Sequence, residues 1–262
     1  MIQGRFPVID QVEITPQIYR ITIESEIIAR QSQPGQFVQL RIHEGIDPLL
    51  RRPFSIHRVH RDRNTLDLFY KIVGRGTHLM RSFKKGDTVD LLGPLGKGFV
   101  IDRDFQQAVI VTGGMGSAPM FFLIDELLDA GKKIVLYWGA RSKNEIYQLS
   151  ELKKTNVEVH ITTDDGSMGH QGMVTDLFES SLPSLQNSGT FRGFVCGPKS
   201  MIQVMQKIAE KTRFSWQVSM EERMACGIGV CMGCGVKMKS GMLPMVCSDG
   251  PVFDLSEVLF DG

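Results

Sequence analysis

The 262-residue sequence predicts a multidomain chain of β and α/β type. Short stretches of alternating apolar and polar residues fill residues 1–101, strands alternate with helices over 102–215, and 216–262 is rich in glycine, methionine and cysteine. These patterns predict an antiparallel β-barrel, a doubly wound parallel sheet and a small C-terminal subdomain, in that order.

The barrel prediction rests on the two-residue period of β-strands. Apolar and polar side chains alternate over residues 19–24 and again over 66–70. Turn-forming residues separate these stretches at 33–36, 62–64 and 84–87. Short antiparallel strands at this spacing form a small barrel or a sandwich.

The second region has the order of elements typical of a parallel sheet. A short apolar strand in "QAVIVTGGMGSAP" runs into glycines, a helix in "MFFLIDELLDAG" ends at Gly131, and "KKIVLYWG" is the next strand. Strands follow at "VEVHITT" and "FRGFVCG", the latter leading to a helix that begins near Pro198. Such alternation predicts a doubly wound fold.

Charge and hydropathy limit the partners and the compartment. Thirty Lys and Arg stand against 29 Asp and Glu, so the chain has no charge excess to hold nucleic acid. The start "MIQGRFPVID" lacks a signal pattern, and no apolar run approaches the roughly 20 residues that span a bilayer. We expect a cytoplasmic protein, without membrane or nucleic-acid binding, whose cysteines serve as ligands or catalytic groups rather than disulfides.

Four of the five cysteines lie close together near the end of the chain, at positions 226, 231, 234 and 247. The spacing C-x4-C-x2-C with a later fourth cysteine matches plant-type [2Fe-2S] ligation. Cys226, Cys231, Cys234 and Cys247 are therefore the candidate metal ligands, and the glycines among them suit a loop that wraps a cluster. A four-cysteine zinc site is the alternative, although it more often uses two C-x2-C pairs.

Six methionines surround these cysteines, at positions 220, 224, 232, 238, 242 and 245. Methionine packs well in cores and also on adaptable protein-binding surfaces, so both roles stay open.

Two stretches in the first region suit a flavin nucleotide. In "RRPFS", Arg52 offers a forked cation for pyrophosphate and Ser55 a hydroxyl for a flavin ring nitrogen. In "YKIVGRGT", residues 70–77, glycines permit close phosphate approach at the start of a short helix. The candidate FAD-binding residues are Arg52, Pro53, Phe54, Ser55, Tyr70, Lys71, Gly74, Gly76 and Thr77, with Ser55 also a candidate catalytic residue.

Two stretches in the second region suit a nicotinamide dinucleotide. "TGGMGSAP", residues 112–119, follows a strand and opens a helix, although Pro119 departs from G-x-G-x-x-G. Cys196 in "CGP" ends a strand at the edge where such sheets bind ligands, and is either catalytic or a small buried side chain. The candidate dinucleotide-binding residues are Gly113, Gly114, Gly116, Ser117 and Ala118.

In this order and spacing, RPFS, GRGT, GGMGSAP and CGP resemble the ferredoxin-NADP reductase superfamily over roughly residues 5–212. The resemblance implies an FAD-binding barrel over 1–101, a pyridine-nucleotide domain over 102–215, and Cys196 beside the nicotinamide. The resemblance also implies NAD rather than NADP. The residues by themselves would permit the 2′-phosphate of NADP, because the acidic residue expected after the second strand is missing and Arg141 is present.

The tail "MEERMACGIGVCMGC" with Cys247 closely resembles the electron-transfer subunits of dihydroorotate dehydrogenase B. That resemblance implies an oxidoreductase subunit of pyrimidine biosynthesis with FAD and a [2Fe-2S] cluster, the latter within 216–262. It further implies a separate FMN-containing catalytic subunit, in a heterotetramer of two of each. Electrons from dihydroorotate would then cross the cluster and FAD to NAD+. Two alternatives are a free-standing reductase feeding an oxygenase or ferredoxin, and a zinc-binding interaction module.

Overall fold

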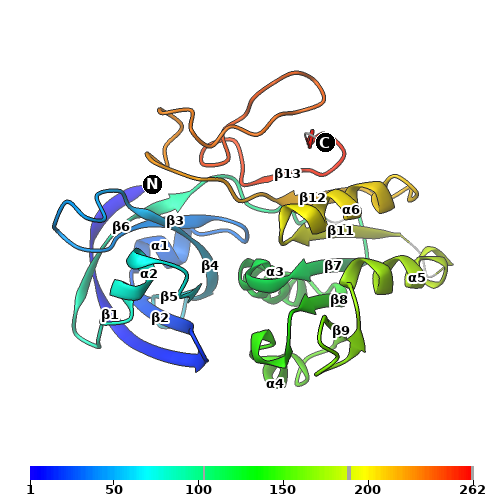
Figure 1. The fold of residues 1–262 in the computed structure, drawn as a ribbon, viewed down its shortest axis with the longest axis horizontal. Helices are drawn as coiled ribbons and strands as arrows, with labels where there is room; N and C mark the ends of the chain where they lie inside the picture. The colour runs from blue at the N-terminus through cyan, green and yellow to red at the C-terminus, as the bar shows by residue number, and fades with distance from the viewer. Residues whose placement is uncertain (103, 188–189, 261–262) are drawn as a thin grey trace. The chain divides into compact units, whose positions relative to one another are not determined.

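The computed structural model describes residues 1–102, 104–187 and 190–260 (Figure 1). The chain forms two compact units. The first comprises Met1–Gly98, Glu221–Val236 and Leu243–Val252. The second comprises Phe99–Met220, Lys237–Met242 and Phe253–Gly262. The C-terminal segment thus contributes to both units.

The first unit is built on a closed antiparallel barrel with strand order β1-β2-β5-β4-β3-β6, which confirms the predicted architecture (Figure 1). Its strands are β1 (Ile2–Thr15), β2 (Ile18–Glu24), β3 (Phe37–Arg41), β4 (Arg52–His60), β5 (Thr65–Lys71) and β6 (Thr88–Leu95). Two short helices belong to it, α1 (Glu26–Gln31) and α2 (Arg75–Met80). Closure pairs every strand with two neighbours and leaves the barrel without a free edge.

The predicted alternation holds in β2 but not in β5. In β2, Ile21 and Ile23 are buried, whereas Arg20 and Thr22 are half-buried. In β5, every residue from Thr65 to Tyr70 is buried. Two neighbours pack against β5: α1 contacts the strand, and the centroid of the His57 ring lies 4.0 Å from that of the Phe69 ring.

The second unit contains a seven-stranded sheet with order β10-β9-β8-β7-β11-β12-β13. Its strands are β7 (Gln107–Gly113), β8 (Lys133–Ala140), β9 (Val157–Thr163), β10 (His170–Gln171), β11 (Phe191–Cys196), β12 (Trp216–Ser219) and β13 (Val252–Asp254). The pairs from β10 through β12 are parallel. β12 and β13 were not among the predicted strands, because three or four residues carry too little periodic pattern.

Helices lie on both faces of this sheet, as the doubly wound prediction requires. They are η1 (Gly114–Ser117), α3 (Ala118–Asp129), η2 (Lys143–Glu145), α4 (Leu149–Leu152), α5 (Val174–Asn187) and α6 (Lys199–Ala209). The chain leaves β7 and β11 in opposite directions along the sheet, so the right-handed rule for such crossovers assigns α3 and α6 to opposite faces. α5, which the sequence did not predict, contacts α6. Among the described residues, no helix is both long and apolar enough to span a bilayer.

The strand order reverses between β7 and β11. From β7 the chain proceeds to β8 and β9 on one side, and from β11 it proceeds to β12 on the other. Sheets of this kind bind ligands at such a switch point, outside the carboxyl ends of the strands. Gly113 ends β7 and Cys196 ends β11, so the two predicted nucleotide motifs begin at this point.

A buried carboxylate joins three barrel strands. Asp67 accepts hydrogen bonds from the Thr22 hydroxyl at 2.6 Å and from His60 Nε2 at 3.1 Å. Burial raises the pKa of Asp67, but these two hydrogen bonds, together with the electrostatic attraction of His60 and Arg20, hold it below its ordinary value. Asp67 is thus charged at neutral pH and stabilises the barrel.

Replacing Asp67 with Asn is expected to lower the free energy of unfolding by about 2 kcal/mol at pH 7, because the hydrogen bonds lose a charged acceptor. Since the folded-state pKa is lowered, this contribution is present above the ordinary value of 3.8 and is lost as the pH falls through the folded-state pKa. Urea denaturation of the wild type and D67N from pH 7 to pH 3 measures it. The exposed turn residue Asp62 supplies the control, D62N; an equal effect of both variants would contradict the prediction.

Candidate functional site

The four clustered cysteines lie in the first unit, and their side chains form two pairs. Cys234 Sγ is 3.3 Å from Cys247 Sγ. Cys231 donates to Cys226 through its backbone N–H, at 3.4 Å, and also through its side chain. The loop therefore brings together all four predicted ligands as Cys226 with Cys231 and Cys234 with Cys247.

Backbone N–H groups point at two of the sulfurs. Ile228 N–H donates to Cys226 Sγ at 3.5 Å, and Gly229 N–H donates to Cys247 Sγ at 3.0 Å. Burial acts to raise the pKa of Cys226, but the hydrogen bonds from Ile228 and Cys231 lower it to about 6. Burial and the hydrogen bond with Cys234 raise the pKa of Cys247 to about 12. A bound cation would deprotonate both, because metal ligation requires the thiolate.

Two glycines of the cysteine loop, Gly227 and Gly229, are needed for their backbone angles. Gly227 has φ 73° and Gly229 has φ 81°, in the left-handed region that favours glycine. Gly235 serves packing instead, because an added Cβ would lie 2.8 Å from Leu243 Cγ. A Cβ on Gly227 would lie 2.6 Å from Nε2 of Gln39, a fully buried residue of β3.

The paired arrangement suits a binuclear cluster better than a single zinc ion. Zinc in a structural site is surrounded tetrahedrally by four ligands at one point. A [2Fe-2S] cluster instead has two irons that share four thiolates. Two separate pairs of sulfurs with backbone N–H donors fit that requirement.

Apolar side chains around the cysteine loop are exposed. Val230 is 75% exposed, Met232 is 63% exposed and Ile228 is 44% exposed. We call these three residues the loop rim. Other methionines of the segment, including Met238 and Met245, are buried. The methionine-rich segment therefore serves packing and also presents an apolar surface beside the cysteines.

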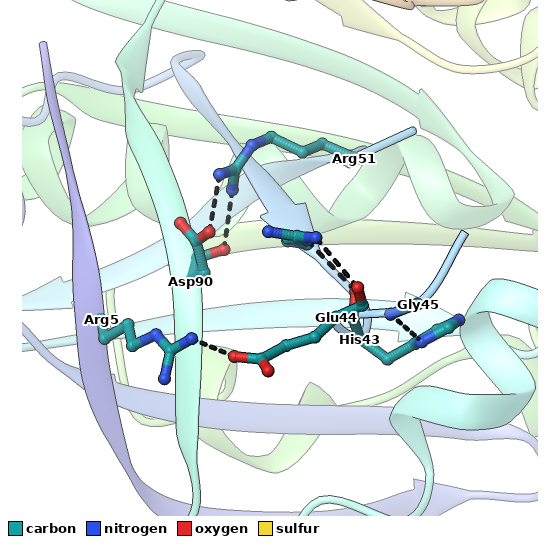
Figure 2. A network of polar contacts seen from close by, with 7 residues as sticks. Arg5, His43, Glu44, Gly45, Arg51 and Asp90 are labelled. Carbon is teal, nitrogen blue, oxygen red and sulfur yellow. Dashed lines mark hydrogen bonds and ion pairs between the residues drawn. The ribbon is translucent and has the colours of Figure 1, made fainter. Parts of the chain in front are cut away.

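The loop that precedes the predicted flavin motif is held by ion pairs (Figure 2). Arg51 makes two hydrogen bonds to Asp90 on β6, to the backbone oxygen at 3.0 Å and to Oδ2 at 2.8 Å. Arg5 pairs with Glu44, whose backbone oxygen accepts from Arg41 at 3.1 Å. Arg51 is thus bound to the barrel wall at Asp90, whereas Arg52 Nη1 donates to the backbone oxygens of Leu50 at 2.6 Å and Arg51 at 3.2 Å.

Arg52 lies beside the second flavin motif. An added Cβ on the buried Gly76 would lie 3.5 Å from Arg52 Nε, so the guanidinium passes close to the backbone of α2. The Thr77 hydroxyl donates to Gly74 O at 3.0 Å and accepts from Gly74 N–H at 3.2 Å, which shapes the turn. The two motifs, 24 positions apart from Arg52 to Gly76, lie side by side in the barrel.

The second flavin motif also contains a buried hydroxyl that is available to a ligand. Among the described residues, the Tyr70 hydroxyl is buried without a hydrogen-bond partner. The Tyr70 ring stacks on Tyr19 at 5.6 Å and meets the edge of Phe54 at 6.0 Å. Ser55 on β4 is half-buried, as are Pro53 and Lys71. An orphan hydroxyl, a guanidinium and a glycine-lined turn fit a flavin nucleotide.

The two nucleotide motifs meet at the switch point of the sheet. The Thr112 hydroxyl donates to Cys196 O at 2.9 Å. An added Cβ on Gly116 would lie 2.6 Å from Cys196 O and from the Gly197 backbone, so only glycine fits. Gly114 has φ 54°. The structure thus packs "GGMGSAP" directly against "CGP".

Three of the predicted nucleotide residues have buried side chains. Ser117, Ala118 and Cys196 are 1%, 4% and 1% exposed. The Ser117 hydroxyl bonds within the protein, to Gly114 O and to the Tyr147 hydroxyl. Ser117 and Ala118 can therefore offer a ligand their backbone rather than their side chains.

Sequence analysis missed two polar residues that support these motifs. Gln39 lies on β3 opposite Pro53 and contacts the cysteine loop at Gly227. Tyr147 lies between η2 and α4 and bonds Ser117. No local pattern could have revealed either residue, because Gln39 and Gly227 are far apart in the sequence, as are Tyr147 and Ser117.

Three family models match the chain. Residues 6–99 match the oxidoreductase FAD-binding domain, and residues 110–207 match the oxidoreductase NAD-binding domain. Residues 221–259 match the iron-sulfur cluster binding domain of dihydroorotate dehydrogenase B. The matches cover all three groups of motifs described above.

Solved structures share the fold. A structure of an NADH-dependent reduced ferredoxin-NADP oxidoreductase, studied for flavin-based electron bifurcation, aligns with a TM-score of 0.86 at 29% identity, over 97% of this chain and 89% of that one. The ferredoxin NADP+ reductase from Neisseria gonorrhoeae aligns with a TM-score of 0.68 at 17% identity, over 80% and 92% of the two chains.

Full-length relatives are similar in sequence. The electron transfer subunit of dihydroorotate dehydrogenase B (NAD(+)) from Desulforamulus reducens is 37% identical, with 95% of each chain covered. The subunits of the same name from Fusobacterium nucleatum and Bacillus mycoides are 36% and 34% identical, with 95% and 96% of each chain covered. The chain therefore belongs to the family of dihydroorotate dehydrogenase B (NAD(+)) electron transfer subunits.

Proposed function

We propose that this chain connects dihydroorotate oxidation on a separate FMN-containing catalytic subunit with the reduction of NAD+. The observation that carries the proposal is the surface loop in which four thiols form two pairs beside exposed apolar side chains. Reduction of NAD+ by itself needs no such loop. A one-electron centre at the surface indicates exchange of electrons with another protein.

When bound, FAD can exchange electrons singly or in pairs, a [2Fe-2S] cluster exchanges one at a time, and nicotinamide carries hydride. We propose that Cys226, Cys231, Cys234 and Cys247 hold the cluster. The Ile228 and Gly229 N–H groups that point at Cys226 and Cys247 would then stabilise thiolate charge.

The remaining site residues divide between the two nucleotides. We propose that FAD contacts Arg52, Ser55, Tyr70, Gly74 and Gly76, while Pro53, Phe54, Lys71 and Thr77 shape its site. The backbone of Gly113, Gly114, Gly116, Ser117 and Ala118 would hold NAD, with Cys196 beside the nicotinamide. The support is the orphan Tyr70 hydroxyl in the barrel and the packing of the glycine turn on Cys196 at the switch point.

We propose functional domains at 1–101, 102–215 and 216–262, the last of which supplies the cluster ligands while its segments pack into both compact units. The loop rim is proposed to contact the catalytic subunit, in a complex with two copies of each chain. A cytoplasmic location accords with five cysteines that are free of disulfides in the structure.

The cysteine loop is tested by Cys231→Ser. The variant is expected to lose the visible absorption and low-temperature EPR signal of a cluster, because one thiolate of a pair is removed. Dihydroorotate:NAD+ activity with the catalytic subunit should fall by at least about a hundredfold, while NADH oxidation by an artificial dye stays within about twofold. Intact dihydroorotate:NAD+ activity in the variant would contradict the proposal.

The flavin site is tested by Arg52→Ala. Loss of the guanidinium beside Gly76 is expected to weaken FAD binding about tenfold or more, since a charge-assisted hydrogen bond to phosphate is lost. Equilibrium dialysis followed by flavin fluorescence measures retention. Arg63→Ala, at an exposed turn position of the same barrel, is the control and should retain FAD like the wild type. Equal retention in both variants would refute the assignment.

The docking surface is tested by Val230→Glu. A carboxylate on the loop rim is expected to weaken association with the catalytic subunit about tenfold or more, because it must be desolvated on contact. Met173→Glu, on an apolar side chain that is 60% exposed in the second unit, is the matched control. Sedimentation velocity measures the complex, and iron content confirms that the cluster is retained. Unchanged association of an iron-replete V230E would exclude the rim from the interface.

A further inference from the structure

The geometry points to Tyr147 as a positioning residue for NAD binding, which acts by fixing the glycine turn through Ser117. The inference rests on the proposed function of that turn. Tyr147 is 2% exposed and lies outside both nucleotide motifs. Its hydroxyl is 2.6 Å from Ser117 Oγ, and both oxygens are buried.

The direction of these hydrogen bonds follows from counting protons. Ser117 Oγ lies 2.7 Å from Gly114 O, and a carbonyl oxygen can only accept. The single hydroxyl proton of Ser117 is therefore given to Gly114, and Tyr147 must donate to Ser117. Burial raises the pKa of Tyr147, with a smaller opposite effect from Ser117, so the phenol keeps its proton at neutral pH.

This chain of two hydrogen bonds ends at Gly114, the first residue of η1. Gly114 has φ 54°, in the left-handed region, and as a glycine its backbone is less restricted than that of other residues. The hydrogen bond from Ser117 holds Gly114 O in place. It thereby orients the peptide that carries the next backbone N–H of the turn. Such groups are what a dinucleotide pyrophosphate binds.

The Tyr147 ring cannot easily move away from Ser117. It stacks on Phe121 of α3, with ring centroids 5.9 Å apart, and meets the edge of Trp138 of β8 at 5.2 Å. Both neighbours are at most 1% exposed. α3 and β8 thus hold the Tyr147 ring in place, and the Tyr147 hydroxyl holds the glycine turn through Ser117.

The chain offers a matched comparison in Tyr137. This tyrosine is also 2% exposed, lies on β8 of the same sheet, and bonds a serine, Ser181 of α5. Its partner belongs to a helix outside the nucleotide motifs. Tyr137→Phe therefore removes a buried Tyr–Ser hydrogen bond without affecting the turn.

The test compares FAD-loaded wild type, Tyr147→Phe, Ser117→Ala, the double variant and Tyr137→Phe. In NADH oxidation by an artificial dye, Y147F and S117A should each raise KM for NADH about three- to tenfold, with kcat within about twofold. The KM of the double variant should not exceed the higher KM of the two single variants, because both substitutions break the same chain of hydrogen bonds. Y137F should leave KM unchanged. Additive effects, or equal KM in Y147F and Y137F, would overturn the inference.

Hydrogen exchange without nucleotide gives a readout that does not depend on activity. Backbone amides of residues 113–118 should exchange faster in Y147F than in Y137F, because the turn is no longer held. Equal exchange would overturn the positioning role. Wild-type protein that neither binds nor oxidises NADH would instead overturn the proposed function, and the exchange comparison would still decide whether Tyr147 holds the turn.

Discussion

A buried amide connects the cysteine loop with the barrel. Gln39 of β3 is fully buried, lies opposite Pro53 of the flavin motif, and contacts Gly227, the residue after Cys226. Gly227 must be glycine there because of its positive φ and because a Cβ would collide with the amide. Within one compact unit, this contact holds the cysteine loop against β3, the strand that pairs with β4, which carries Arg52 and Ser55. Electron exchange between a cluster and a flavin depends on such proximity.

In the second unit, the nucleotide site likewise depends on a glycine that fits a close contact and on buried polar side chains. Its sheet brings the ends of β7 and β11 together, and the close contact of Gly116 with the Cys196 and Gly197 backbone leaves no room for a side chain. Polar groups then fix the backbone: Thr112 holds Cys196, and Ser117 holds Gly114. Both units therefore present backbone N–H groups in turns whose shape is set by buried hydroxyl or amide side chains.

The barrel, the doubly wound sheet and the grouping of the cysteines could be predicted from sequence, because each has a local pattern: a period of two, alternating elements, or a fixed spacing. Other features could not. β13 joins the sheet from a segment after the cysteines, β5 is buried on both faces, and Tyr147 supports Ser117 from 30 positions away. All three depend on contacts between distant segments, which leave no periodic pattern in the sequence. The Ser117 hydroxyl is bonded within the protein, so the predicted contact of Ser117 with a ligand would use its backbone.

The central claim is that one chain holds a flavin and a two-iron cluster between a catalytic partner and NAD. The most direct measurement is the visible absorption spectrum of the purified protein with iron, sulfide, zinc and flavin assayed, before and after mixing with an FMN-containing dihydroorotate-oxidising subunit. We predict two irons, two sulfides and one FAD per chain, and NAD-linked dihydroorotate oxidation that arises only on mixing. A colourless protein with one zinc per chain, or a coloured one that gains no such activity with the partner, would contradict the account.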